Sequence, residues 1–101
     1  MEVKSVTLVE EGVAMFPDAP TQRGSKHLKE LLQAKNEGYR CAVLFIVQRP
    51  DGQKFTPHWQ RDREFSENLR QAAAAGVEVY AYSCEVTPQA LTLLKEIPVV
   101  L

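Results

Sequence analysis

Residues 41–47 read Cys-Ala-Val-Leu-Phe-Ile-Val, an unbroken run of seven apolar residues. A half-exposed strand alternates apolar and polar side chains, whereas a continuous short run is typical of a strand buried on both faces of a sheet. The run therefore predicts a central strand, covered on both faces, in an α/β protein. The turn signal Arg49-Pro50-Asp51-Gly52 ends it, and a polar loop is expected over residues 53–61.

Amphipathic helices are expected before and after this strand. The first is predicted over residues 25–37, with leucines at helical spacing, Ser25 as its N-cap and Gly38 at its end. The second is predicted over residues 62–75, and a further strand follows over residues 77–82.

The pattern of the N-terminal region predicts a hairpin. Residues 3–9 are rich in β-branched types and partly alternate, which favours one strand, and residues 13–16 form a second apolar run. Glu10-Glu11-Gly12 between them can turn the chain. Two closely spaced prolines predict that residues 17–21 form a loop.

The order of these elements predicts the fold class. Both helices end near a glycine and lead directly into a strand, which is the rhythm of crossover units in a partly parallel sheet. We expect an α/β domain with a mixed β-sheet flanked by helices, spanning residues 1–101 as a single domain. At the C-terminus a short helix is expected over residues 88–95 and an extended segment over residues 97–101.

Composition narrows the functional classes. With 101 residues, 45% of them hydrophobic and 25% charged, the sequence matches one globular domain and excludes a disordered chain. The net charge of -1 means that any nucleic-acid surface must be a local basic patch. No apolar run is long enough to span a membrane. Cys41 and Cys84 fit no disulfide or metal spacing, which favours a reducing, cytoplasmic environment.

The first candidate site is Glu2-Val3-Lys4. Alternate residues of a strand share a face, so the Glu2 carboxylate and the Lys4 ammonium would stand side by side. A carboxylate can hold a hard divalent cation, and a neighbouring lysine can stabilise charge that develops on a phosphate. Taken alone, such a pair is more often an ordinary solvated strand face.

The second candidate site is the basic start of the first predicted helix. Arg23, Lys26, His27 and Lys29 lie there, and a helix N-terminus attracts anions. Arg49, at the end of the buried strand, could also meet a phosphate. These residues fit a phosphate-binding surface, but a solvated helix face and an ordinary turn arginine explain them as well.

Several blocks of the sequence occur together in one protein family. They are Glu-Val-Lys-Ser-Val-Thr-Leu (2–8), Phe-Pro-Asp-Ala-Pro-Thr (16–21), Arg-Gly-x-Lys-His-Leu-x-Glu-Leu (23–31), Val-Leu-Phe-Ile-Val-Gln-Arg (43–49), Phe-x-Pro (55–57), Gly-Val-Glu-Val (76–79) and Ile-Pro-Val-Val-Leu (97–101). In these blocks the chain strongly resembles the sugar fermentation stimulation protein (SfsA) family along its whole length.

The resemblance implies a fold and a function. The family joins an N-terminal OB-like domain to a C-terminal domain that resembles the PD-(D/E)xK, restriction-endonuclease-like nucleases, and it is described as DNA-binding and linked to regulation of sugar (maltose) metabolism in bacteria. This chain resembles the C-terminal domain only, truncated at its N-terminal side. Glu2 and Lys4 match the E-x-K of the nuclease motif, and Lys26 and His27 match the family's helix motif.

One departure from the nuclease motif concerns the metal. The motif needs an acidic residue upstream of E-x-K, and only Met1 precedes Glu2. Asp18 is the substitute ligand that we can name, because the predicted hairpin would return the chain toward Glu2. We therefore expect Mg²⁺ binding through Glu2 and Asp18 to be weak or absent, and this chain alone to show little or no nuclease activity.

These observations favour a DNA-binding, nuclease-like domain of a bacterial regulator. DNA would be bound without sequence specificity, through Arg23, Lys26, His27, Lys29 and Arg49. Two alternatives remain open: a Mg²⁺-dependent nuclease that uses Glu2 and Lys4, and a non-catalytic protein interaction module. We also expect self-association through an open sheet edge over residues 3–9 or 13–16.

Overall fold

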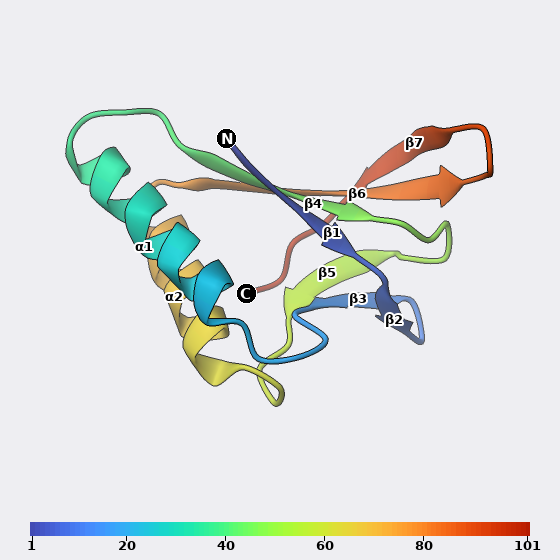
Figure 1. Cartoon of the computed structure of the whole chain (residues 1–101), viewed down its shortest axis with the longest axis horizontal. Helices are drawn as coiled ribbons and strands as arrows, with labels where there is room; N and C mark the ends of the chain where they lie inside the picture. The colour runs from blue at the N-terminus through green and yellow to red at the C-terminus, as the bar shows by residue number, and fades with distance from the viewer.

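The computed structural model describes residues 1–101 and contains seven strands and two helices. In chain order they are β1 (Glu2–Val6), β2 (Leu8–Glu10), β3 (Val13–Phe16), α1 (Gln22–Asn36), β4 (Ala42–Val47), β5 (Lys54–Pro57), α2 (Arg63–Ala74), β6 (Glu78–Val86) and β7 (Leu91–Ile97). Both helices and a small sheet lie on the same side of a larger sheet (Figure 1). The fold is therefore the predicted α/β arrangement with mixed sheets.

The larger sheet has four strands in the order β1-β4-β6-β7. Strands β1, β4 and β6 run parallel, and β7 runs antiparallel to β6. Strand β4, which holds most of the apolar run, lies between β1 and β6, so its predicted central place is confirmed. Parallel neighbours need long crossover connections, and α1 and α2 lie within the two connections here.

The smaller sheet has three strands in the order β2-β3-β5. Strands β2 and β3 form the hairpin, with Leu8 opposite Met15, and β3 pairs in parallel with β5. Because β3 lies in the middle of this sheet, the prediction of an open edge at residues 13–16 is wrong. Strand β1 does form an edge of the larger sheet, so the other predicted edge exists.

The prediction of one continuous strand over residues 3–9 is wrong. The chain leaves extended pairing at Thr7, and the two halves enter different sheets. Glu2 is registered with Val43 in the larger sheet, whereas only β2 takes part in the hairpin with β3. The hairpin therefore does not fold back onto the Glu2 end of the chain.

Two further segments differ from prediction. The expected polar loop over residues 53–61 contains β5, and the expected helix over residues 88–95 is mostly β7. Pro57 ends β5, and the strand lies at the edge of its sheet, where a residue without an N–H is tolerated. Strand β7 pairs with β6 across the Thr87–Ala90 turn. Tertiary pairing, which local spacing does not reveal, decides both segments.

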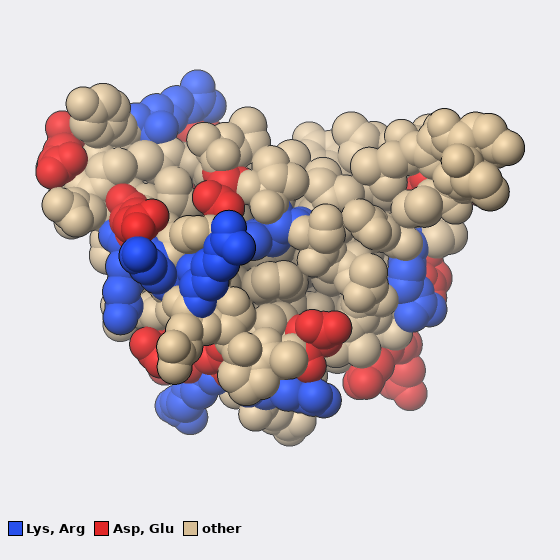
Figure 2. Space-filling view, viewed as in Figure 1, with Lys and Arg blue, Asp and Glu red and all other residues tan.

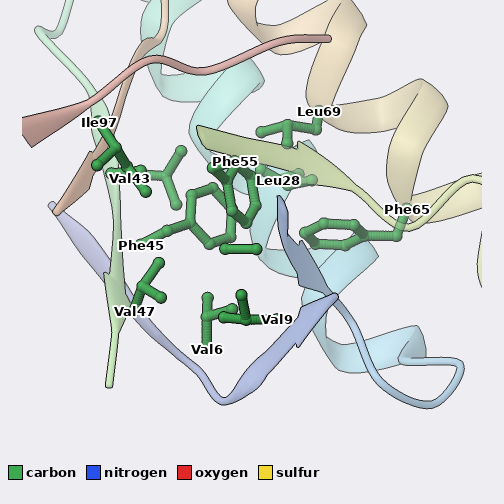
Figure 3. Packing of buried hydrophobic residues seen from close by; sticks show 12 residues of the cluster. Val6, Val9, Leu28, Val43, Phe45, Val47, Phe55, Phe65, Leu69 and Ile97 are labelled. Atoms are coloured by element: carbon green, nitrogen blue, oxygen red, sulfur yellow. The ribbon is translucent and has the colours of Figure 1, made fainter. Parts of the chain in front are cut away.

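The main hydrophobic core lies between the larger sheet, the smaller sheet and the helices. Figure 3 shows the side chains of this cluster pointing toward one another. Its centre is aromatic, since the rings of Phe45 and Phe55 stack with centroids 4.2 Å apart and Phe16 packs against Phe45 and Phe65. Every helix and strand contributes at least one residue: Val6, Val9, Ala14, Leu28, Val43, Phe45, Val47, Phe55, Phe65, Leu69, Ala81 and Ile97.

The two faces of β4 are not equally covered. Val43, Phe45 and Val47 point into the core and are 0% exposed. On the opposite face Ile46 is buried, whereas Leu44 is half-buried. The expected cover of this strand is therefore complete on the core face and partial on the other. Neither helix is long and apolar enough to cross a membrane.

Candidate phosphate-binding site at the start of helix α1

Glu2, Lys4 and His27 form one cluster where the edge strand β1 meets helix α1. The Lys4 Nζ atom lies 2.8 Å from His27 Nδ1 and 3.6 Å from Glu2 Oε1. Glu2 Oε1 also lies 3.3 Å from His27 Nδ1. The prediction that Glu2 and Lys4 share a face is confirmed, and the structure adds His27 to them.

The alternation of β1 explains how these polar groups reach the rim of the core. Glu2, Lys4 and Val6 share the face that carries Val43 and Phe45 in the neighbouring strand. Val6 is buried in the core, whereas Glu2 and Lys4 lie toward the open end, with 34% and 14% of their side chains exposed. The cluster is thus partly screened from water but open to a ligand.

The contact between Lys4 and His27 favours one tautomer of a neutral imidazole ring. A lysine ammonium can only donate hydrogen bonds, so Nδ1 of a neutral His27 accepts and the ring proton sits on Nε2. The approach of Glu2 Oε1 to the same nitrogen is then a close contact without a hydrogen bond. In this tautomer the Nε2–H group is a donor that could bind a phosphate oxygen or another acceptor.

The start of α1 is built from a threonine cap and a glycine. Thr21, rather than the predicted Ser25, is the N-cap, and its Oγ1 accepts from the Gly24 N–H at 3.0 Å. Ser25 lies inside the helix and is buried. A Cβ atom on Gly24 would meet Thr21 Cγ2 at 2.7 Å and the Phe65 ring at 3.2 Å, so glycine allows the two helices to approach closely.

The basic residues of α1 are exposed and differ in their pairing. Lys29 lies 3.6 Å from Glu64 Oε1 of α2, whereas Arg23 and Lys26 form no ion pair. The first turn of α1 also contains no acidic residue. Figure 2 shows basic side chains gathered over the start of this helix, with acidic side chains beside them. Two cations without an ion-pair partner thus lie in the first turns of α1, the helix that carries His27.

Two predicted site residues are not part of this cluster. The Arg49 guanidinium donates to both carboxylate oxygens of Asp51, at 3.0 and 2.7 Å, and to the Val9 carbonyl. The Asp18 carbonyl accepts from Arg61 Nη1 at 3.0 Å. Asp18 does not join Glu2 and His27 in a group that could hold a metal ion, and the hairpin that was expected to return it toward Glu2 starts only at β2.

The residues present do not fit a complete divalent-cation site. Hard cations such as Mg²⁺ and Ca²⁺ prefer several oxygen ligands. The cluster supplies the Glu2 carboxylate, and the chain has no group of three or more His, Cys, Asp or Glu side chains placed to hold a metal ion. Asp18 does not complete such a group with Glu2 and His27. No chemical step through a cation follows from these residues.

Sequence reasoning missed the residue that positions α1. One carboxylate oxygen of Asp62 accepts from the Phe65 N–H at 3.0 Å and so caps α2, while the other accepts from the Thr21 N–H at 2.8 Å. Asp62 therefore holds the N-termini of both helices together. Its place before a helix signals a cap, but its bond to Thr21 depends on a contact 41 residues away.

A second polar cluster lies away from the site, at the start of β4 and β6. The Arg40 guanidinium bonds both oxygens of Glu78, at 2.6 and 3.0 Å, and the Tyr80 hydroxyl donates to Glu78 at 2.6 Å. The bonds from Arg40, and then from Tyr80, lower the pKa of Glu78 to about 2. The hydrogen bond to Glu78 raises the pKa of Tyr80. This cluster ties neighbouring strands together.

The chain is similar to known proteins over nearly its whole length. The family model "Sugar fermentation stimulation protein RE domain" matches residues 1–90. The sugar fermentation stimulation protein homolog of Desulforamulus reducens is 59% identical over 99 residues, which are 98% of this chain and 41% of that protein. The homolog of Clostridium acetobutylicum is 52% identical over 101 residues, covering 100% of this chain and 44% of that protein.

The fold has a solved counterpart. The structure of Pyrococcus furiosus SfsA in complex with Ca²⁺ superposes with a TM-score of 0.93 at 35% sequence identity, over 99% of this chain and 44% of that chain. The chain thus spans less than half the length of these relatives. The family model and the identity to the curated homologs together confirm the resemblance seen in the sequence. This chain belongs to the sugar fermentation stimulation protein (SfsA) family.

Proposed function

We propose that this chain is a DNA-binding, nuclease-like domain that contacts the phosphate backbone without sequence specificity. The observation that carries the proposal is the contact between the Glu2, Lys4 and His27 cluster and the basic start of α1. Cations and N–H donors make the contacts to phosphate groups in most protein–DNA complexes. Arg23 and Lys26, which have no acidic partner, are the residues that we expect to supply most of the affinity.

The charge distribution supports weak binding. The net charge of -1 gives no long-range attraction to DNA, so affinity has to come from the local patch. Lys29 pairs with Glu64 and Arg49 pairs with Asp51, and both would have to exchange a carboxylate for a phosphate. We expect Arg49 to contribute less than Lys26 for this reason. From the family resemblance we further propose that such binding serves the regulation of sugar metabolism, including maltose.

A salt titration of DNA binding tests the proposal. Fluorescence anisotropy with a labelled duplex is measured for the chain, for Lys26→Ala and for Lys95→Ala, a matched control on β7 at the opposite edge of the larger sheet. Each phosphate contact releases counterions, so Lys26→Ala should weaken binding and flatten the log–log salt slope by roughly 1. Lys95→Ala should change neither quantity. Equal effects of both variants, or no binding at low salt, would contradict the proposal.

A metal-dependent nuclease is the second candidate. The adjacent Glu2 and Lys4 side chains favour it, since they give the carboxylate and ammonium of an E-x-K pair at 3.6 Å. Pyrococcus furiosus SfsA was solved with Ca²⁺, a hard cation of the kind that a carboxylate binds. With one carboxylate in the cluster, we propose that this chain alone binds Mg²⁺ weakly and cleaves DNA little or not at all. Strong Mg²⁺-dependent nicking that is lost in Glu2→Gln would instead establish the enzyme.

The non-catalytic interaction module stays the third candidate. It predicts that the chain binds no DNA at any salt concentration, which the same titration detects.

A further inference from the structure

Trp59, the only tryptophan of the chain, lies in the turn that joins β5 to α2. Two backbone hydrogen bonds close this turn, from the N–H groups of Arg61 and Asp62 to the His58 carbonyl. Trp59 is half-buried, and it neither belongs to the hydrophobic core clusters nor packs against them. Its indole ring is therefore held at the surface and is not a core side chain.

One face of the Trp59 ring is covered by an arginine of α2. The guanidinium carbon of Arg70 lies over the ring, 5.1 Å from its centroid. Arg70 Nη2 also donates to Glu67 Oε2 at 3.0 Å, which helps to hold the guanidinium above the ring. A planar guanidinium stacks well on an aromatic face. No other aromatic ring stacks on Trp59, so a nucleobase on the opposite face would complete a stack of three planar groups.

Arg61 supplies a cation in the same turn. Its side chain forms no ion pair, and one guanidinium nitrogen donates to the Asp18 carbonyl at 3.0 Å. The Asp18 carboxylate is itself unpaired, which limits how much affinity for a phosphate this turn can provide. The other nearby acids are engaged in a helix cap or in pairs with basic side chains of α1 and α2: Asp62, Glu64 and Glu67. Any large gain in affinity at the turn must therefore come from the ring.

The turn lies next to the start of α1, where the phosphate contacts are proposed. The bond from Arg61 to the Asp18 carbonyl and the bond from the Thr21 N–H to Asp62 join it to the loop before α1. Figure 1 shows the two loops side by side at the starts of both helices. A DNA strand whose phosphates contact the start of α1 would therefore pass the turn that holds Trp59.

Stacking on an aromatic ring requires a base whose face is free. In a duplex the neighbouring bases cover both faces, whereas the bases of a single strand can lie on an aromatic side chain. Every base has such a face, so this contact adds affinity without reading the sequence. We propose that Trp59 stacks on an unpaired base of the bound DNA, and that the chain therefore prefers single-stranded DNA to duplex. This inference rests on the proposed DNA-binding function and names the form of DNA that is bound.

Because Trp59 is the only tryptophan, its fluorescence tests the proposal directly. The chain is titrated with a short single strand of thymidine nucleotides, with a duplex of the same length, and with a sugar-phosphate strand of that length without bases. Fluorescence anisotropy of the labelled probes gives the affinities. We expect the thymidine strand to quench Trp59 and to bind at least about 5-fold more tightly than the strand without bases. The duplex should quench Trp59 weakly. Equal quenching by all three probes, or no quenching, would overturn the proposal.

Substitutions at the ring give an independent measurement. Trp59→Ala should lower the affinity for the thymidine strand to that for the strand without bases. The salt slope should not change, because an aromatic ring releases no counterions. Trp59→Phe should keep part of the preference, and Tyr39→Ala, a control at another exposed aromatic residue, should change nothing. Equal losses for both strands in Trp59→Ala would show that the residue only supports the fold.

Lys26→Ala separates this inference from the proposed function. It should weaken binding of the strands with and without bases alike and flatten the salt slope. If Lys26→Ala has these effects and Trp59→Ala has none, the proposal for Trp59 fails while DNA binding at α1 stands. If no probe binds at low salt, both fail.

Discussion

The backbone N–H of Thr21 donates to the carboxylate of Asp62, so the N-cap residue of one helix is held by the N-cap residue of the other. This bond, 2.8 Å long, joins two chain segments that are 41 residues apart in sequence. It places the basic start of α1 against α2 and, through α1, sets where His27 meets Lys4 and Glu2. The candidate site thus depends on a residue that touches none of its members.

We expect Asp62→Ala to destabilise the fold by about 2 kcal/mol, because one substitution removes a helix cap and the bond to Thr21. Urea unfolding followed by circular dichroism measures the loss as a lower midpoint at unchanged slope. Asp51→Ala, which removes an exposed carboxylate paired with Arg49, should cost less than about 1 kcal/mol. Similar losses in the two variants would contradict the role of Asp62.

The aromatic core predicts a larger effect at Phe55. Its ring is 0% exposed and stacks on Phe45 at 4.2 Å, so Phe55→Ala should cost about 3–5 kcal/mol. That is a large part of the 5–15 kcal/mol that holds a typical domain folded, and the variant should be partly unfolded at 37 °C. Leu93→Ala on exposed β7 should change stability by less than about 0.5 kcal/mol. The unfolding midpoints of both variants check the difference.

Acid should break the Arg40–Glu78 bond only at low pH. The pKa of Glu78 is lowered to about 2, so its contribution to stability is complete above the unfolded value of about 4.3 and is lost as the pH falls toward 2. Carboxyl-carbon NMR measures the titration directly. In Arg40→Ala the pKa of Glu78 should rise toward 4.5 but stay below it, because Tyr80 still donates to the carboxylate. An unchanged pKa in this variant would contradict the assignment.

The tautomer of His27 is a further expected outcome. With Lys4 donating to Nδ1, neutral His27 should carry its proton on Nε2, which long-range nitrogen–proton NMR spectra distinguish from the other tautomer. In Lys4→Met this donor is lost, and the two tautomers should become mixed. A proton on Nδ1 in the unmodified chain would show that His27 donates to Glu2 instead.

Parts of the fold follow from residues 41–47 and the two glycine-ended helices. A short unbroken apolar run is typical of a strand at the centre of a sheet. Gly38 and Gly76 have positive φ values of 96° and 103°, which suit the end of a helix. The partners of the shorter strands do not follow. Thr7 divides a segment whose sequence resembles a single strand. Residues 2–6 pair with β4 and residues 8–10 pair with β3, and local sequence does not reveal which partner each half takes.

The candidate site could likewise be predicted from the sequence only in part. Glu2 and Lys4 could be placed side by side because a strand alternates, and Lys26 and His27 could be placed on one helix because their block resembles a family motif. The contact of His27 with Lys4 and the bond of Asp62 to Thr21 bridge elements far apart in sequence, and local patterns carry no information about either. The expected place of Asp18 near Glu2 relied on a hairpin that included the strand of Glu2. In the structure that hairpin begins two residues after β1 ends.

The central claim is that DNA is contacted where β1 meets the start of α1. NMR chemical-shift mapping of the 101-residue chain with a short duplex at low salt tests it most directly. We predict shifts concentrated at Lys4, Arg23, Lys26 and His27, small shifts at Arg49 and none along β7. Shifts confined to β7, or no shifts at a duplex concentration that saturates other weak DNA-binding domains, would contradict the claim.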